Sequence, residues 1–108
     1  MGKTTLSPEK QTIERHSFSP LYNVVLLDDD DHTYDYVIEM LQKIFFFSQE
    51  QAFRHAEEVD HAGRTVVITC ELPQAEFACA QIQGYGPDKR LARSKGSMSA
   101  ILEPAPVT

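Results

Sequence analysis

A run of four aspartates, Asp28–Asp31, is the part of this sequence best suited to chemistry. It follows the apolar residues 22–27 and precedes a helical pattern that begins at Tyr34. Unpaired N–H groups and the positive end of the helix dipole stabilise one or two carboxylates at such a junction. Capping does not account for all four, so we expect the turn to bind a cation through charge-assisted hydrogen bonds.

Two familiar uses of an acidic turn fit this sequence less well. Positions one, three, five and twelve of a calcium-binding loop are matched, but Thr33 stands where that loop requires glycine; the four are Asp28, Asp30, His32 and Glu39. A phosphate-accepting receiver domain needs a second aspartate at the end of a later strand, and neither later apolar run ends in one. A metal-responsive or regulatory interaction domain that uses residues 28–31 is kept as the alternative hypothesis.

Apolar residues near the aspartates indicate what kind of cation would bind. Tyr34, Val37 and Val59 belong to two predicted helices and could form a pocket beside the carboxylates. Such a site suits a ligand with an ammonium group at one end and a hydrophobic group at the other. The free N-terminal residue of a peptide is a ligand of this kind. No nucleophile lies near His32 and Asp29 in the sequence, so we expect a binding protein and not an enzyme.

Hydrophobic periodicity predicts the elements that position these residues. In chain order they are a strand at 22–27, a helix from Tyr34 to about Phe47, a helix from Ser48 to Gly63, a strand at 64–70, a helix from Pro73 to Gly84 and a strand at 98–103. This order predicts the α+β class, with a three-stranded sheet covered on one face by three helices. Residues 1–20 are polar and are predicted to be a flexible N-terminal tail, so that the domain spans residues 21–108.

Local signals define the ends and faces of these elements. Ser48 and Gln51 have the spacing of a capping box, and Gly63 suits the left-handed position that ends a helix. The predicted inner face of the second helix comprises Phe53, Ala56 and Val59, and that of the third helix comprises Phe77, Ala78 and Ile82. Along the strand at 64–70, alternation predicts that one side carries Val66, Ile68 and Cys70 and the other side carries Thr65, Val67 and Thr69.

The composition is that of one globular domain, with 108 residues, 42% of them hydrophobic, and a formal net charge of −6. Acids dominate residues 28–61, which argues against nucleic acid as a partner. Four bases lie within residues 86–96, which we interpret as a solvated loop. No apolar run reaches the roughly 20 residues that span a bilayer, and no apolar signal core is found. We expect a cytoplasmic protein without a membrane partner, in which Cys70 and Cys79 are free thiols.

The segments YNVVLLDDDDHTYDYVIEMLQKIF and SQEQAFRHAEEVDHAGR, with ILE near the end, resemble the ClpS family, the adaptors of the Clp ATP-dependent protease. The resemblance covers about residues 21–85 and resumes at the last predicted strand. It implies an α+β fold like that of the C-terminal domain of the ribosomal stalk protein, with no catalysis and no cofactor. It also implies that the chain, expected to be a monomer, binds N-degron substrates by a bulky hydrophobic N-terminal residue and hands them to a Clp-type AAA+ unfoldase.

The resemblance also implies which residues form the site. Asp29 and Asp30 match the acidic pair of the family, while Asp28 and Asp60 stand where the family has the Asn and His that hold the substrate's α-amino group. The implied ligands of that group are therefore Asp28, Asp29 and Asp60. The implied side-chain pocket and its rim comprise His32, Tyr34 at the position of a gating Met, Val37, Ala56 in place of a larger residue, Val59 and Met98.

Overall fold

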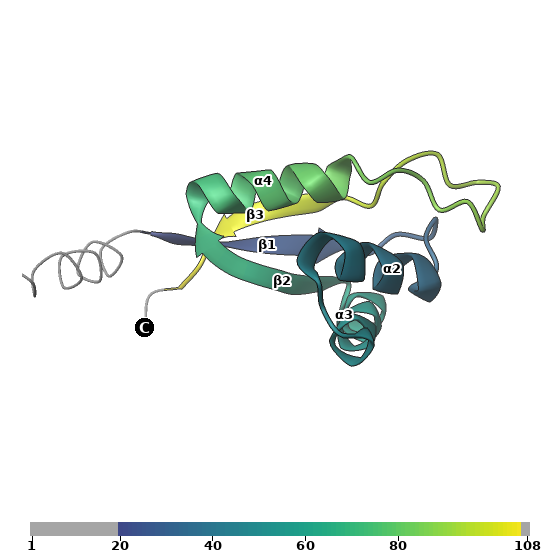
Figure 1. Ribbon diagram of the computed structural model, residues 1–108, viewed down its shortest axis with the longest axis horizontal. Coiled ribbons are helices and arrows are strands. Elements are labelled where there is room, and N and C mark those ends of the chain that lie inside the picture. Colours follow the sequence, from purple (N-terminus) through teal and green to yellow (C-terminus); the bar gives the residue numbers. More distant parts are fainter. Residues whose placement is uncertain (1–19, 107–108) are drawn as a thin grey trace, which may run out of the picture.

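The central strand of the sheet is β1 (Leu21–Leu27), which pairs antiparallel with β2 (Arg64–Glu71) on one side and with β3 (Ala100–Pro104) on the other. The computed structural model describes residues 20–106, and Figure 1 shows these strands side by side in the order β2-β1-β3. Apart from Pro20, the predicted tail of residues 1–20 lies outside the described residues.

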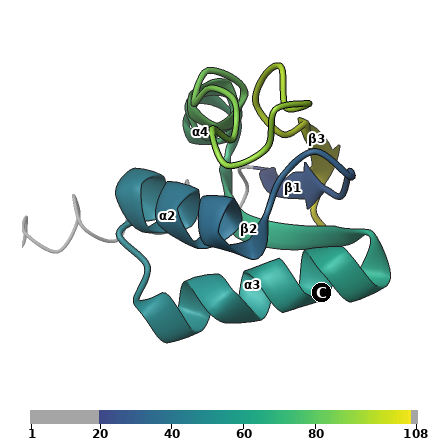
Figure 2. The same cartoon turned by 90° about the vertical axis from the view of Figure 1, so that its right-hand side faces the viewer.

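Within the described residues, three helices cover one face of this sheet: α2 (Tyr34–Phe45), α3 (Gln49–Ala62) and α4 (Leu72–Gln83). Figure 2 shows α4 and α2 on the same side of β1, with α3 beside β2. The predicted α+β class and the three-stranded sheet are therefore confirmed. None of the helices in this part of the chain is long and apolar enough to cross a membrane.

The ends of α2 are set by Thr33 and Phe46. The Thr33 hydroxyl oxygen accepts a hydrogen bond from the Tyr36 N–H at 3.1 Å and so caps the first turn. Phe46 ends the helix in the left-handed conformation, with a φ of 58°, which turns the chain toward α3. The helix predicted to reach about Phe47 is therefore shorter than expected.

The ends of α3 agree with the sequence prediction. Ser48 and Gln51 form the capping box, in which each side chain accepts a hydrogen bond from the other residue's N–H at 3.1 Å. Gly63 ends the helix with a φ of 86°, a conformation that strains residues with a side chain. By contrast, α4 begins one residue before the predicted start, so that Pro73 is its second residue, where its missing N–H leaves no helical hydrogen bond unmade.

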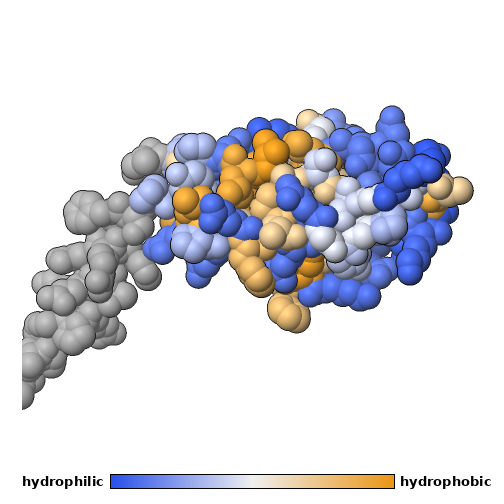
Figure 3. Space-filling model, turned by 90° about the horizontal axis from the view of Figure 1, so that it is seen from above, coloured by the Kyte–Doolittle hydropathy of each residue, from blue (hydrophilic) through white to orange (hydrophobic). Residues whose placement is uncertain are grey.

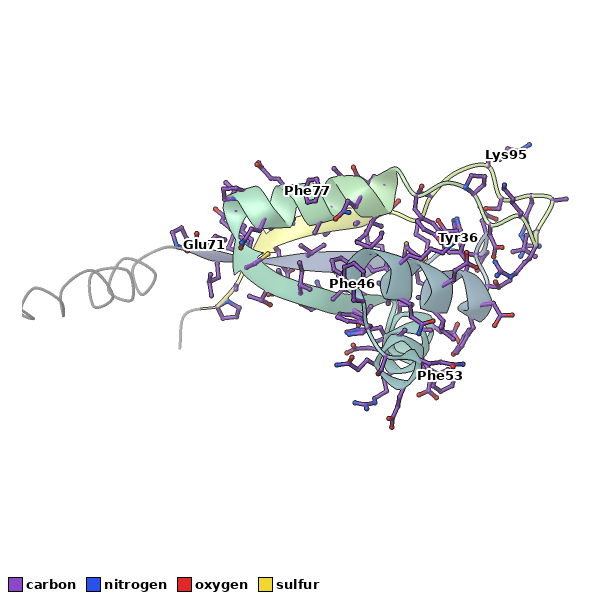
Figure 4. All side chains as sticks on the ribbon, viewed as in Figure 1. Tyr36, Phe46, Phe53, Glu71, Phe77 and Lys95 are labelled. Carbon is purple, nitrogen blue, oxygen red and sulfur yellow. The ribbon has the colours of Figure 1, made fainter. Side chains whose placement is uncertain are left out.

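Small side chains bring α4 close to the sheet. Its buried residues, Ala75, Ala78, Cys79 and Ile82, follow the helical spacing of a single inner face. The prediction that Phe77 belongs to this face is wrong, because Phe77 is 66% exposed (labelled in Figure 4). Adjacent residues lie about 100° apart around a helix, so Phe77 cannot share the narrow face that is centred on its neighbour.

The inner face of α3 agrees in part with the prediction. Ala56 and Val59 are buried against the core, as expected. Phe53 is partly exposed instead, and its ring packs on the ring of Tyr34 with a centroid distance of 5.9 Å. Ala52 takes the inner position on the preceding turn. As a result, α3 presents two small residues, Ala52 and Ala56, to the core, and an aromatic residue lies at its edge.

The predicted alternation along β2 holds from Thr65 to Val67 but is wrong beyond that point, because the strand then changes sides. Thr65 and Val67 are buried toward the helices, whereas Val66 is 36% exposed on the open face of the sheet. The pairing of β2 with β1 shifts register in the middle of the strands, which marks a β-bulge. Beyond it, Ile68 and Cys70 pack against the core as well. A bulge inserts one extra residue, so the residues after it face the side opposite to that expected from strict alternation.

Both cysteines are free thiols, as predicted. Cys70 is half-buried in β2, and the buried Cys79 donates a hydrogen bond from its sulfur to the Ala100 carbonyl oxygen at 3.3 Å. Burial raises the pKa of both thiols above the ordinary value, which keeps them protonated and unreactive at neutral pH.

Removing the capping box tests the local origin of α3. The substitution Ser48→Ala leaves the Gln51 N–H without its partner, and we expect it to lower the free energy of unfolding by about 1 kcal/mol. Gln49→Ala is the matched control, because Gln49 lies in the same exposed turn outside the box. Urea denaturation of the two variants measures the difference. Equal stabilities would show that the box contributes nothing to the fold.

Candidate functional site

The acidic turn, residues 28–33, connects β1 to α2 at one end of the sheet. The Asp28 N–H donates to the Gly63 carbonyl oxygen at 3.0 Å, which ties the turn to the start of β2. Oδ1 of Asp29 accepts hydrogen bonds from the Asp31 N–H at 2.9 Å and from Nδ1 of His32 at 2.7 Å. The carboxylate of Asp29 therefore organises the turn through hydrogen bonds within it.

A small cavity of about 50 Å³ opens beside this turn. It is lined by all nine residues that the sequence analysis named, together with Thr33: Asp28, Asp29, His32, Tyr34, Val37, Ala56, Val59, Asp60 and Met98. The turn and α3 supply the carboxylates, while α2, α3 and the segment before β3 supply buried apolar walls. The structure thus brings these residues together in one place, and their part in binding stays a prediction.

A contact between α2 and α3 borders the cavity. The Tyr34 hydroxyl donates a hydrogen bond to Oδ2 of Asp60 at 2.8 Å, and its ring rests on Phe53. This hydrogen bond, followed by partial burial and the negative charge of Asp60, raises the pKa of Tyr34 to about 12. Asp60 is therefore already bonded in the free protein, but to a neutral donor.

The carboxylate of Asp28 is repelled by neighbouring carboxylates. Burial, followed by the nearby charges of Asp60, Asp29 and Asp30, raises the pKa of Asp28 above its ordinary value, although a hydrogen bond from the Asp29 N–H opposes the shift. A cation placed among these groups would relieve the repulsion. This part of the cavity is thus suited to a positively charged group.

His32 joins the acidic turn to a distant part of the chain. Its side chain is 4% exposed and lies between Oδ1 of Asp29 and the Gly96 carbonyl oxygen, each 2.7 Å from a ring nitrogen. Carboxylate and carbonyl oxygens only accept, so both contacts are hydrogen bonds at once only when both ring nitrogens carry protons. The ring also packs on that of Tyr36 with a centroid distance of 4.5 Å. His32 therefore supports the wall of the cavity more than it reaches into it.

Two residues near the site were missed by sequence reasoning. Thr33 lines the cavity, and Asp88 holds Thr33 from the loop between α4 and β3. The acid and hydroxyl pattern that caps a helix could have identified Thr33. Asp88 is the single acid within the basic stretch 86–96, and no local pattern shows that it lies next to Thr33. In addition, Asp30 of the implied acidic pair does not line the cavity.

The residues that matched a calcium loop are not gathered around one point. Glu39 lies on α2, where its carboxylate accepts hydrogen bonds from Lys43, Tyr85 and Arg90, and these lower its pKa to about 2. Among residues 20–106, no group of three or more His, Cys, Asp or Glu side chains is arranged to hold a metal ion.

Comparison with known proteins places the chain in a family. Residues 17–91 match the family model of the ATP-dependent Clp protease adaptor protein ClpS. The chain is 33% identical over 89 residues to the adapter protein ClpS of a Synechococcus species, covering 82% of this chain and 96% of that protein. It is 41% identical over 76 residues to ClpS of Campylobacter jejuni, covering 68% of this chain and 76% of that protein.

A solved structure has the same fold. The structure of Agrobacterium tumefaciens ClpS2 bound to L-phenylalaninamide matches with a TM-score of 0.69 and 27% identity. The match covers 80% of this chain and 98% of that one. Most of the described domain therefore has a counterpart in that protein.

The Tyr34–Asp60 contact can be tested without a ligand. Asp60→Asn removes the negative charge beside the phenol, so we expect the pKa of Tyr34 to fall from about 12 toward its unperturbed value, while burial and the charges of Glu57 and Asp28 keep it somewhat above that value. Ultraviolet titration, with each protein compared with its own Tyr34→Phe derivative, isolates this group from the other tyrosines. Glu57→Gln, which removes a weaker nearby charge, is the control and should change little. An unchanged titration in Asp60→Asn would show that the contact does not form in solution.

Proposed function

This chain belongs to the ClpS family of ATP-dependent Clp protease adaptors, and from this premise we propose that it binds proteins by a free N-terminal residue with a bulky hydrophobic side chain and delivers them to a Clp-type AAA+ unfoldase. An adaptor carries its substrate without changing it chemically, so the protein is not an enzyme. The preferred N-terminal residue and the handover to the unfoldase are part of the proposal.

The observation that carries this proposal is the mixed lining of the cavity. Carboxylates of Asp28, Asp29 and Asp60 line it together with the buried side chains of Val37 and Val59. A primary ammonium has three N–H donors and a positive charge, and these carboxylates offer several acceptors and negative charge. The ligand of ClpS2, L-phenylalaninamide, joins an α-amino group to a phenyl ring in the same way.

The cavity has to enlarge before it can accept an aromatic side chain. Its volume of about 50 Å³ is a third of the roughly 150 Å³ that accommodates benzene in an engineered protein cavity. Tyr34 and Asp60 form part of its wall. We expect the Tyr34 ring to swing outward on binding, so that Asp60 exchanges a phenol donor for the ammonium group. Ala56 then leaves space in the cavity, because no larger side chain occupies that position.

Other predictions from the sequence stay predictions. They are the cytoplasmic location, the monomeric state and the absence of nucleic-acid or membrane partners. The alternative hypothesis, a metal-responsive or regulatory interaction domain, is separated from the adaptor by thermal melting, since a ligand that binds only the folded state raises the midpoint. A shift with calcium or zinc and none with a Phe-headed peptide would favour the alternative.

Recognition of the α-amino group is tested by acetylation. A Phe-headed peptide and its N-acetylated form differ in charge and in two donors, while their side chains are the same. The acetylated form leaves carboxylates of the site unpaired, and we expect it to bind more weakly by at least about 2 kcal/mol, which is about thirtyfold in Kd. Isothermal titration measures both. Equal affinities would refute the ammonium site.

The space that Ala56 leaves in the cavity is tested by substitution. We expect wild type to prefer Phe-headed over Leu-headed peptides by about 1 kcal/mol, from added buried area and ring contacts. Ala56→Met fills the space and should abolish this preference. The Leu-headed peptide is the internal control, and the melting midpoint shows whether the variant folds. A preference that survives Ala56→Met in a folded variant would place the side chain elsewhere.

A further inference from the structure

Residues 85–97, most of the loop between α4 and β3, lie against the acidic turn. In Figure 1 this loop extends beyond the end of the sheet, and Figure 2 shows it next to the turn that leads into α2. Seen from above in Figure 3, this end of the molecule is mainly hydrophilic, whereas apolar surface gathers over the middle. The four bases of this loop are exposed, in agreement with the predicted solvated loop, but several of its residues also bind other parts of the protein.

Three contacts from the loop hold successive residues of the turn. Nε of Arg93 donates to the Asp30 carbonyl oxygen at 3.0 Å and to Oδ1 of Asp31 at 3.2 Å. The Gly96 carbonyl oxygen contacts the His32 ring, as described above. The third contact is made by Asp88, whose Oδ2 accepts from both the N–H and the hydroxyl of Thr33 at 2.8 Å.

Asp88 is the best anchored of these groups. It is only 1% exposed, and its other oxygen accepts from the Arg90 N–H at 3.0 Å and from the Arg90 guanidinium at 3.2 Å. Burial alone would raise the pKa of this carboxyl, but the hydrogen bonds from Thr33 and Arg90 outweigh burial and hold its pKa at about 2. Asp88 is therefore a charged, fully bonded group at neutral pH.

The contact with Thr33 reaches both sides of the cavity. When the Thr33 hydroxyl donates its proton to Asp88, its oxygen is oriented to accept from the Tyr36 N–H and cap α2. The first turns of α2 carry Tyr34 and Val37, which form walls of the cavity. Immediately before Thr33 lies the turn that presents the carboxylates. Fixing Thr33 thus fixes the junction between the acidic turn and α2, which supply carboxylates and apolar walls to the site.

We propose that loop 85–97 positions the ammonium-binding turn and that Asp88 is the positioning residue, acting through Thr33. This inference rests on the proposed function, because it assumes that the turn receives the α-amino group of a peptide. Asp88 does not itself line the cavity. Its role is to keep the carboxylates of the turn and the start of α2 in one fixed relation.

The test compares affinities for a Phe-headed peptide and its N-acetylated form. We expect Asp88→Ala to reduce the preference for the free amino group by about tenfold, while the affinity for the acetylated peptide stays within about twofold. A general loss of structure would instead lower the affinity for both peptides. Asp88→Asn keeps one acceptor oxygen at the same position and should give an intermediate loss, and it serves as the reporter if Asp88→Ala does not fold.

The matched control is Glu39→Gln. Glu39 also binds Arg90, at 2.9 Å, but it does so from α2 and outside the cavity. The Glu39→Gln variant should therefore prefer the free amino group as strongly as wild type does. Hydrogen exchange at the Thr33 N–H gives a readout without peptide, and it should accelerate in both Asp88 variants and stay slow in Glu39→Gln.

The outcomes separate the two proposals. A wild-type protein without preference for the free amino group overturns the proposed function, and the positioning role with it. A normal wild-type preference that both Asp88 variants retain overturns the positioning role alone, as does a Thr33 N–H that exchanges at the wild-type rate in these variants.

Discussion

Repulsion among carboxylates where β1 meets α2 is the constraint on which this end of the molecule depends. The acids of the turn differ in the groups that offset this repulsion. Asp29 faces His32, Asp31 pairs with Arg93 at 3.2 Å, and Asp28 carries a raised pKa. Asp60, brought in by α3, accepts from the phenol of Tyr34. Arg93, which pairs with the turn, binds Asp31, and Asp31 does not line the cavity, so the carboxylates that line the cavity stay available for a positive ligand.

The sheet explains why these groups meet. The end of β1 pairs with the beginning of β2, with Leu27 opposite Arg64, so the acidic turn lies beside the end of α3 and its Asp60. On the other side Leu26 lies opposite Ala100, which brings the segment that carries Met98 to the same end of the sheet. Three chain connections therefore converge at one end, and the cavity lies where they meet. Antiparallel pairing makes this convergence a consequence of strand register.

Much of this could be predicted from local patterns. The capping box at Ser48, the left-handed Gly63 and the helical spacing of the apolar residues in α2 depend on residues close in sequence, and they describe the elements correctly. Sequence patterns failed to predict which side chains face the core where contacts between elements determine this. Phe77 and Ala78 are both acceptable on an inner face, but only the small residue lets α4 approach the sheet. The bulge in β2 depends on its pairing with β1, which the sequence of β2 alone does not contain.

The residues of the site likewise include some that local patterns predict and some that they do not. The acids and apolar walls of the site could be named from residue types and from a family resemblance, since each belongs to an element with a clear local signal. Asp88 could not, because 55 residues separate it from Thr33 and its neighbours in sequence are mostly basic. The bases of the loop face solvent, as expected, yet Arg90 and Arg93 also form ion pairs with Glu39 and Asp31. Long-range ion pairs of this kind follow from the fold and not from sequence spacing. Arg93 pairs with Asp31, which does not line the cavity, and no arginine or lysine of residues 20–106 lines the cavity beside Asp28, Asp29 and Asp60. An incoming ammonium group would replace the repulsion among these carboxylates with charge-assisted hydrogen bonds.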